Sequence, residues 1–347
     1  MSYLEIDGSQ GEGGGQIIRT ALSLATIFQR SIHITNIRAG RKEPGLRPQH
    51  LQSVIAASKL CDGRLGGASV GSTEIIFAPR EPIRSFTGSI DTGTAGSISL
   101  IAQTIIPISI FCGTKLVTVI TGGTEVSNSP TIDYLERLVF PIYRQIGADI
   151  SIQVARRGYY PRGGGIVKLS CTPGQPNSQI EFEEQEREEQ TKILSVSRGL
   201  PNHVSERQLD SAKSTLLSSN MRQITSELDY AGDSASPGSS VLVYRADRHS
   251  LVGGSSLGEK GKRSEVVGRE AAVSFLQESE ASPNVDSHLS DMLVTLASCL
   301  KGESQFTTPV ITEHFKTNSA VAQQITGCEV TFRQIGRSWQ VKISGHK

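Results

Sequence analysis

The sequence predicts an α/β protein with a large domain of three repeated, layered α+β units and a smaller α/β domain inserted before the third unit. Two observations predict this fold class. A helix-like segment followed by two short strands occurs three times along the chain. Residues 181–280 interrupt this period between the second and third copies. Self-similar units that alternate helices and strands are typical of layered α/β architectures.

Each copy has two halves. The first half is typical of a helix followed by a short strand, at residues 16–39, 95–123 and 286–311. The second half is typical of an amphipathic helix followed by two strands around a turn, at residues 50–79, 131–171 and 318–344. The last strand of each copy shows alternating apolar residues, as in the stretch 166–169. The predicted unit is therefore helix–strand–helix–strand–strand, and we expect three such units to pack around a common axis.

The residues between the second and third copies predict a domain of their own. An acidic run at 181–189 indicates a solvated strand edge or a domain boundary. A strand, a helix at 203–219, two further strands and a helix within 258–279 follow it. We therefore expect the large domain to comprise residues 1–180 and 281–347, and the inserted domain to comprise residues 181–280.

Composition excludes several classes of protein. The formal net charge of +1 argues against a polybasic nucleic-acid coat. The five cysteines lie far apart and form neither a CxxC pair nor a zinc-ligand spacing, which favours reduced thiols. The sequence shows no apolar run of membrane-spanning length and no signal-peptide pattern. We expect a cytoplasmic protein without a membrane partner, and the sequence leaves its oligomeric state open.

A glycine-rich stretch, GEGGGQ at residues 11–16, comes directly before the first predicted helix. It follows a poor strand and matches neither the P-loop nor the Rossmann pattern. Glycines let a backbone approach a ligand closely, and a helix N-terminus attracts anions. Glu12 would repel a phosphate unless a divalent cation lay between them. A tight turn with an exposed glutamate explains the stretch equally well.

Two basic clusters are candidate binding sites. The loop at 38–50 is rich in Gly and Pro and holds Arg38, Arg41, Lys42, Arg47 and His50. Guanidinium groups suit phosphate oxygens, and Arg19 on the first helix is within reach of the same place. The second cluster, RRGYYPRGGG at 156–165, has the residue types that contact nucleic acid by phosphate binding and stacking. Ordinary solvated arginines account for both clusters as well.

His314 is the strongest candidate nucleophile. It precedes a helix that we expect to begin near Thr317 or Asn318, both suitable N-caps. The positive end of a helix lowers the pKa of an imidazole and keeps it neutral. A structural role remains an alternative for a lone histidine. HExxH, GxSxG and the KxDG motif of lysine-adenylating ligases are all absent, which argues against those classes.

These features occur together and in order in one known family. The sequence resembles the RNA 3'-terminal phosphate cyclases, and the matching motifs span essentially the whole chain: DGSQGEGGGQIIRTALSL, IRAGRKEPGLRPQHL, GTAGSISLIAQTIIP, VITGGTEVSNSP, YYPRGGG, LGEKGK, HLSDML and HFKTN. The resemblance implies a large domain of three α/β units with an inserted domain. It also implies ATP-dependent conversion of an RNA 3'-phosphate to a 2',3'-cyclic phosphate through a histidine–AMP intermediate, with Mg²⁺ or Mn²⁺.

The resemblance also implies roles for particular residues. His314 matches the nucleophile, and Glu12 matches the metal-binding carboxylate. Pro130 and His288 match the pair that brackets the adenine. Positions that match phosphate or nucleotide contacts are Arg19, Arg38, Arg41, Gln49, His50 and Gln103, together with the segment Leu289, Ser290, Asp291 and Met292. Met292 replaces a glutamine that is common in the family, and a thioether donates no hydrogen bond.

Two other classes of protein are alternatives to this family. A cyclase-like relative acts in ribosome assembly without catalysis, but it lacks the catalytic histidine, and the combination of His314, Glu12, Arg19 and Arg41 argues against that role here. An enolpyruvyl transferase has similar repeated units, but its chemistry leaves the HFKTN motif at 314–318 unexplained. Turnover of ATP to AMP and pyrophosphate with RNA 3'-phosphate distinguishes the three.

Overall fold

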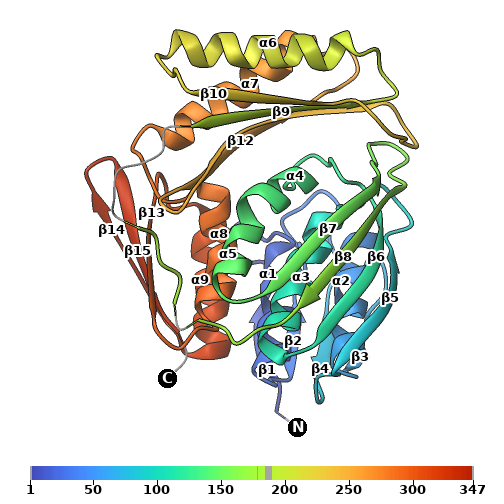
Figure 1. Cartoon of the computed structure of the whole chain (residues 1–347). Coiled ribbons are helices and arrows are strands. Elements are labelled where there is room, and N and C mark those ends of the chain that lie inside the picture. The colour runs from blue at the N-terminus through green and yellow to red at the C-terminus, as the bar shows by residue number, and fades with distance from the viewer. Residues whose placement is uncertain (1, 178, 184–189, 346–347) are drawn as a thin grey trace.

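Three small sheets, two mixed and one antiparallel, make up the larger part of the protein with their helices, and a fourth sheet with two helices lies at one end (Figure 1). The computed structural model describes residues 2–177, 179–183 and 190–345. The predicted acidic run therefore lies largely outside the described residues. Of the described helices, none combines the length and the apolar character needed to cross a membrane.

The first two units have the same topology. The first contains β1 (Leu4–Asp7), α1 (Gln16–Ile27), β2 (Ile32–Thr35), α2 (Pro48–Leu60), β3 (Arg64–Gly66) and β4 (Ile75–Ala78), with sheet order β1-β2-β4-β3. The second contains β5 (Ser85–Asp91), α3 (Ile98–Cys112), β6 (Lys115–Gly122), the helical turns α4 (Ile132–Tyr134), η1 (Leu135–Val139) and α5 (Phe140–Gln145), β7 (Asp149–Arg156) and β8 (Gly165–Thr172), in the order β5-β6-β8-β7. In both sheets the first two strands are parallel and the remaining pairs are antiparallel.

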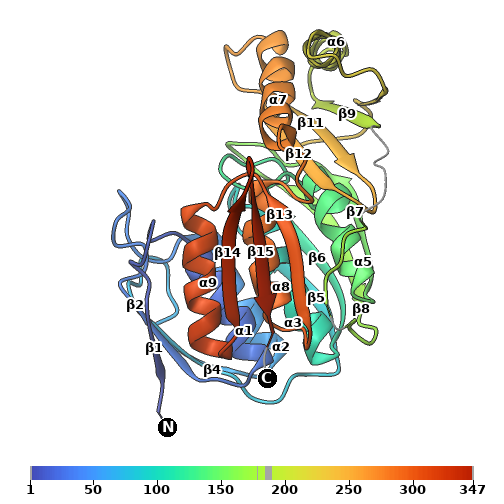
Figure 2. The same cartoon turned by 90° about the vertical axis from the view of Figure 1, so that its left-hand side faces the viewer.

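The third unit repeats this arrangement without the leading strand. It contains α8 (Ser287–Ala297), β13 (Glu303–Thr308), α9 (Glu313–Thr326), β14 (Glu329–Ile335) and β15 (Ser338–Ser344), in the order β13-β15-β14. Figure 2 shows these three strands in front of α8. The predicted five-element unit is thus confirmed, but the sequence interpretation missed the strand that opens the first two copies. β1 is only four residues long, and β5 is mostly exposed, so neither shows a clear apolar alternation.

The inserted segment forms its own sheet. It contains β9 (Thr191–Arg198), α6 (His203–Ser218), β10 (Ile224–Asp229), β11 (Gly238–Ala246), β12 (Leu251–Leu257) and α7 (Ser264–Ser279), in the order β10-β9-β11-β12. The sequence interpretation missed β12, whose sequence LVGGSSL contains two glycines and two serines and few apolar side chains. Both helices pack on one side of the sheet (Figure 1).

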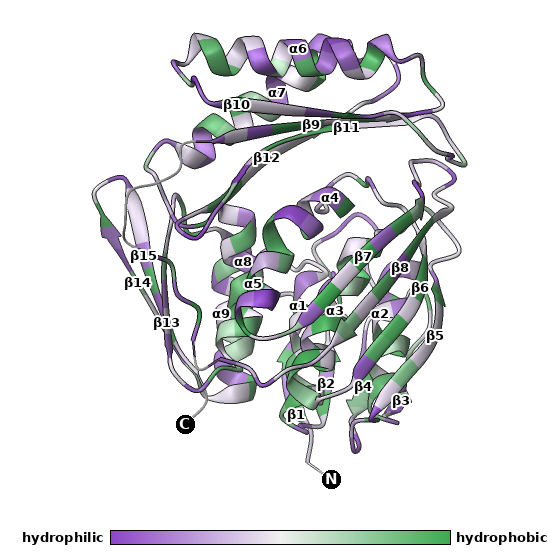
Figure 3. Cartoon of the chain, viewed as in Figure 1, coloured by the Kyte–Doolittle hydropathy of each residue, from purple (hydrophilic) through white to green (hydrophobic). Residues whose placement is uncertain are grey.

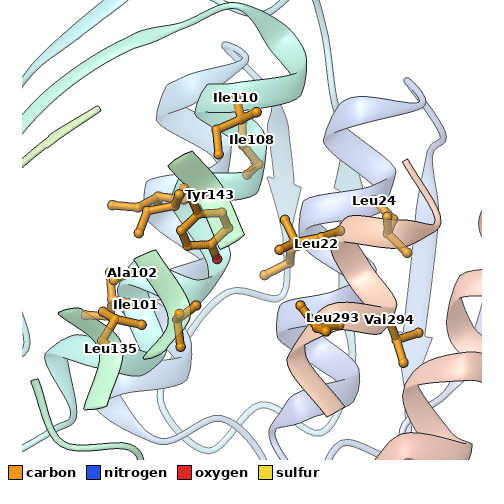
Figure 4. Packing of buried hydrophobic residues seen from close by; sticks show 14 of the residues in the cluster. Leu22, Leu24, Ile101, Ala102, Ile108, Ile110, Leu135, Tyr143, Leu293 and Val294 are labelled. Carbon is orange, nitrogen blue, oxygen red and sulfur yellow. The ribbon is translucent and has the colours of Figure 1, made fainter. Parts of the chain in front are cut away.

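The apolar side chains form two separate cores. The larger one joins the three units, and Figure 3 shows its hydrophobic colouring on α1 and α3 in the middle of the large domain. In Figure 4, Leu22 of α1 lies beside Leu293 of α8. The smaller core lies between the fourth sheet and its helices and includes Val241, Val243 and Phe275. The central helices α1, α3, α8 and α9 are therefore held rigidly by burial, and the site described next is built on them.

Candidate active site

A cavity of about 550 Å³ opens between the central helices and the inserted domain. The helices α1, α3, α8 and α9 form one part of its wall, and residues 126–131, Tyr134, Tyr143 and the inserted domain form the rest. It brings together seven residues predicted from the sequence: Arg19, Gln103, Pro130, His288, Asp291, Met292 and His314. The inserted domain contributes Gly253–Leu257, Glu259, Lys262 and Ser274, none of which the sequence interpretation singled out as a site residue.

His314 lies in the first turn of α9. The helix begins at Glu313, so the predicted start near Thr317 or Asn318 is wrong by about one turn. The N-cap is Thr312, whose Oγ1 accepts a hydrogen bond from the backbone N–H of Phe315 at 2.8 Å. Threonine is a favoured N-cap and an acidic residue in the first turn is typical of a helix start, so Thr312 followed by Glu313 was a signal available in the sequence. The expectation that His314 lies near the positive end of a helix still holds.

Glu12 and Arg41 lie beside the imidazole of His314. The Nε2 atom of His314 is 3.2 Å from Oε2 of Glu12, and the same oxygen is 3.4 Å from Nη2 of Arg41. Burial lowers the pKa of His314, and the positive charge of Arg19 acts in the same direction, whereas Glu12 opposes the shift. The net result favours a neutral ring, which is the nucleophilic form of imidazole.

Asp291 approaches the other nitrogen of the same ring. Its Oδ2 lies 3.8 Å from Nδ1 of His314, within ion-pair range but too far for a hydrogen bond. Its Oδ1 accepts a hydrogen bond from Oγ1 of Thr312 at 2.6 Å, and its carbonyl accepts one from Nδ2 of Asn318 at 3.0 Å. Burial raises the pKa of Asp291 to about 7. The carboxyl group of Asp291 is therefore held by Thr312, the N-cap of α9, and its backbone is held by Asn318. Thr312 and Asn318 are residues of the candidate site that the sequence interpretation missed.

Arg19 and His50 form a donor cluster at the start of α1. Burial lowers the pKa of Arg19 to about 10, and no carboxylate of the described residues lies within ion-pair distance of it. The Nδ1 atom of His50 accepts the backbone N–H of Arg47 at 3.1 Å, so Nε2 carries the proton of the neutral ring. Burial and the neighbouring arginines lower the pKa of His50 to about 3. Arg19, a cation without a counter-ion, and the neutral N–H donor of His50 together are suited to binding an anion.

The glycine triplet makes room for these side chains. A Cβ atom on Gly15 would lie 2.3 Å from Nε2 of His50 and 3.3 Å from Nη1 of Arg19. A Cβ atom on Gly14 would lie 2.0 Å from Oε1 of Gln16. The sequence interpretation assigned the glycines to close approach between backbone and ligand. In the structure they first allow close approach between the backbone and the protein's own binding side chains.

The remaining predicted residues have more varied surroundings. Nη1 of Arg38 donates to the carbonyls of Glu43 and Gly45, so it braces its own loop. Oε1 of Gln49 accepts a hydrogen bond from the backbone N–H of Ser97 at 3.0 Å, which joins α2 to the start of α3.

The Nε2 atom of Gln103 is buried without a protein partner, as expected of a group whose hydrogen bond is completed by a ligand. Leu289 and Ser290 are fully buried in α8 and do not line the cavity.

The second basic cluster is only partly exposed. Arg157 is buried, and it pairs with Glu125, with Asp133 at 2.6 Å, and with Asp229 of the inserted domain at 3.1 Å. The hypothesis that Arg157 contacts nucleic acid is therefore wrong, because its guanidinium is used to join the two parts of the chain. Tyr159 is also buried, whereas Tyr160 and Arg162 remain exposed.

A larger groove of about 1650 Å³ lies elsewhere, between α5, residues 179–183 and β13. It contains none of the residues predicted for the site. Size alone does not identify a catalytic centre. The smaller cavity has the converging polar groups that a catalytic centre requires.

Comparison with known proteins agrees with this geometry. The family model described as RNA 3'-terminal phosphate cyclase matches residues 10–332. The chain belongs to this family. Curated relatives with the same name include one from Pyrobaculum neutrophilum, 39% identical over 99% of this chain and 98% of the relative. One from Sulfurisphaera tokodaii is 40% identical over 94% and 95%, and one from Hyperthermus butylicus is 40% identical over 98% and 97%. The family match excludes the enolpyruvyl transferase alternative.

The residues present fit a divalent cation that is shared with substrate. Within the described part of the chain no three His, Cys, Asp or Glu side chains cluster as a metal cage. Glu12 supplies a single carboxylate that is about half exposed. Mg²⁺ is commonly bound by one or two carboxylates together with substrate phosphates and water, so Glu12 suits such an ion.

Proposed function

We propose that the protein converts an RNA 3'-terminal phosphate to a 2',3'-cyclic phosphate at the expense of ATP. Nε2 of His314 attacks the α-phosphorus of ATP, a P–N bond forms, and pyrophosphate leaves. An oxygen of the RNA 3'-phosphate then attacks the same phosphorus, and the P–N bond breaks. The vicinal 2'-oxygen attacks the 3'-phosphorus, loses its proton, and displaces AMP.

The surrounding residues support the first step. A neutral imidazole is a nucleophile only if one nitrogen has a free lone pair. Glu12 lies 3.2 Å from Nε2 of His314, so Nε2 would become free for attack when a cation draws Glu12 away, with the proton then on Nδ1, the nitrogen that faces Asp291. Charge that develops on the phosphate oxygens requires fixed donors in a site of low dielectric constant. Arg19 and the N–H of His50 are such donors, since neither has an anionic partner among the described residues.

Glu12 would hold Mg²⁺ or Mn²⁺, which supplies charge neutralisation to the phosphates of ATP. Arg41 lies next to Glu12 and suits the β- and γ-phosphates or the RNA 3'-phosphate. The cavity wall at Pro130, His288 and Gln103 suits the adenosine, because it combines two flat surfaces with one buried amide that lacks a partner.

The observation that carries this proposal is the position of His314 at the cavity, with Glu12 beside one ring nitrogen and Asp291 beside the other.

The test of this proposal is incubation of the protein with α-labelled ATP and Mg²⁺ or Mn²⁺, followed by denaturing electrophoresis. We expect a protein-bound label that is lost in acid and survives alkali, as a histidine phosphoramidate does. His314→Ala should abolish it. His203→Ala, at an exposed histidine of α6, is the matched control and should retain it. Labelling of His314→Ala would reassign the nucleophile.

A further inference from the structure

The tip of the β7–β8 hairpin presents one aromatic side chain to solvent. Two tyrosines are adjacent there, and they have opposite environments. Tyr159 is 5% exposed, whereas Tyr160 is 80% exposed, more than any other large hydrophobic side chain in the described residues. Single exposed aromatics are common on proteins, so exposure alone assigns no role. The surroundings of Tyr160 are what indicate a role.

The tip is held in place on both sides of Tyr160. Before it, Arg157 is fixed by the buried carboxylates of Glu125 and Asp133. After it, the N–H of Gly163 donates to the carbonyl of Tyr159 at 2.8 Å. The exposed ring is therefore carried on a fixed backbone, and little conformational entropy would be lost if a ligand stacked on it.

The tip also lies close to the phosphate-binding candidates. A Cβ atom on Gly163 would lie 2.6 Å from Cα of Ala95, so the tip rests directly on the loop before α3. Two residues further on, the N–H of Ser97 donates to Oε1 of Gln49, the neighbour of His50. The loop before α3 thus contacts both the hairpin tip and Gln49, the residue next to His50 in α2.

Arg156 and Arg162 lie near Tyr160 in the chain. Arg162 is exposed, and Arg156 donates from Nε to the carbonyl of Gly164 at 2.7 Å. Among the described residues, no carboxylate lies within ion-pair distance of either arginine. An aromatic face with unpaired cations beside it is the combination that binds single-stranded nucleic acid by stacking and phosphate contact without a sequence preference.

We propose that Tyr160 and Arg162 bind the nucleotides upstream of the RNA 3'-phosphate, with Tyr160 stacking on a base and Arg162 contacting the backbone. This inference rests on the proposed function, because it takes the 3'-phosphate to lie near His50 and Arg41. The surface would favour a single-stranded RNA end over an isolated nucleotide. It would act on substrate binding and leave the reaction of His314 with ATP unchanged.

The test compares a ten-nucleotide RNA 3'-phosphate with a nucleoside 3'-phosphate, which has no upstream nucleotide, in the wild type and in Tyr160→Ala. We expect the variant to raise KM for the longer RNA at least about fivefold, since one stacked base contributes that much or more, and to leave KM for the nucleoside 3'-phosphate unchanged. Tyr160→Phe should behave as the wild type. Tyr3→Ala, at a tyrosine 38% exposed near β1, is the control and should change neither KM value.

Arg162→Gln should reduce the slope of log affinity against log salt concentration by about 0.7, as expected when one phosphate contact with a single strand is lost.

Two further measurements separate this proposal from the proposed function. Labelling with α-labelled ATP alone should be the same in Tyr160→Ala and the wild type. Direct binding of the longer RNA, followed by fluorescence anisotropy, should weaken in Tyr160→Ala whether or not labelling occurs. An unchanged affinity for the longer RNA, or an equal loss for both lengths, overturns the role of Tyr160, including the case in which the tip binds a protein. Absence of label in the wild type would instead overturn the histidine intermediate.

Discussion

The carboxylate of Glu12 faces the imidazole of His314 directly, with Oε2 of Glu12 3.2 Å from Nε2 of His314. The two residues come from opposite ends of the chain, and the packing of α1 against α9 brings them together. In the proposed mechanism, Glu12 therefore lies on the side of Nε2 that the attacked phosphate would have to approach. A cation that draws Glu12 toward the phosphates of ATP would therefore also free the lone pair of His314.

Glu12→Gln should raise the concentration of Mg²⁺ or Mn²⁺ needed for half-maximal labelling of the protein by at least about tenfold. An amide has nearly the same shape as the carboxylate but lacks its charge, so the variant tests metal binding without a change in packing. The measurement is a metal titration of the labelling reaction at saturating ATP. An unchanged titration would remove Glu12 from the metal site.

Asp291→Asn should change how stability depends on pH. The pKa of Asp291 is raised from 3.8 to about 7 by burial, so the folded wild type binds this proton more tightly than the unfolded chain does. The free energy of unfolding of the wild type should therefore fall, relative to that of the variant, as the pH rises from about 4 to about 7. Urea unfolding of both proteins across this range measures the difference. A difference that is independent of pH would contradict the raised pKa.

Arg157→Ala should destabilise the fold by about 3–5 kcal/mol, because it leaves the buried carboxylates of Glu125 and Asp133 without a counter-ion. The matched control is Arg80→Ala, which breaks an exposed ion pair with Asp62 and should cost at most about 1 kcal/mol. Urea denaturation of the two variants measures both effects. Equal stabilities for the two variants would show that the buried cluster contributes no more than a surface pair.

Periodicity predicts the elements of this fold better than it predicts their ends. The three units were predictable because their helices and late strands alternate strongly. The opening strands of two units and the β12 strand were not, since they are short, exposed or rich in glycine. Burial of Arg157 was equally hidden, because its partners lie 24 to 72 residues away in sequence. A charged residue in a cluster gives the same local pattern whether it faces solvent or a buried carboxylate.

The candidate site shows a similar division. His314, Glu12 and Arg19 stand out by residue type and by resemblance to the family, and the structure brings them together. Thr312 and Asn318 do not stand out, because each acts by fixing Asp291 and neither carries reactive chemistry of its own. Such supporting residues are visible only when the hydrogen bonds are known.

Gly15→Ala should reduce labelling at least about tenfold while leaving the fold intact. A methyl group at this position would lie 2.3 Å from Nε2 of His50 and 3.3 Å from Nη1 of Arg19, so both donors would have to move. Displacements of about 1 Å in a positioned group can cost two orders of magnitude in rate. Gly40→Ala is the control, because a Cβ atom there would meet nothing within 4 Å. The measurement is the initial rate of labelling, with circular dichroism and urea unfolding to check the fold. If both variants become labelled at the wild-type rate, Gly15 does not confine the two donors. The glycine triplet would then be explained only by the prediction from the sequence, close approach of the backbone to ATP.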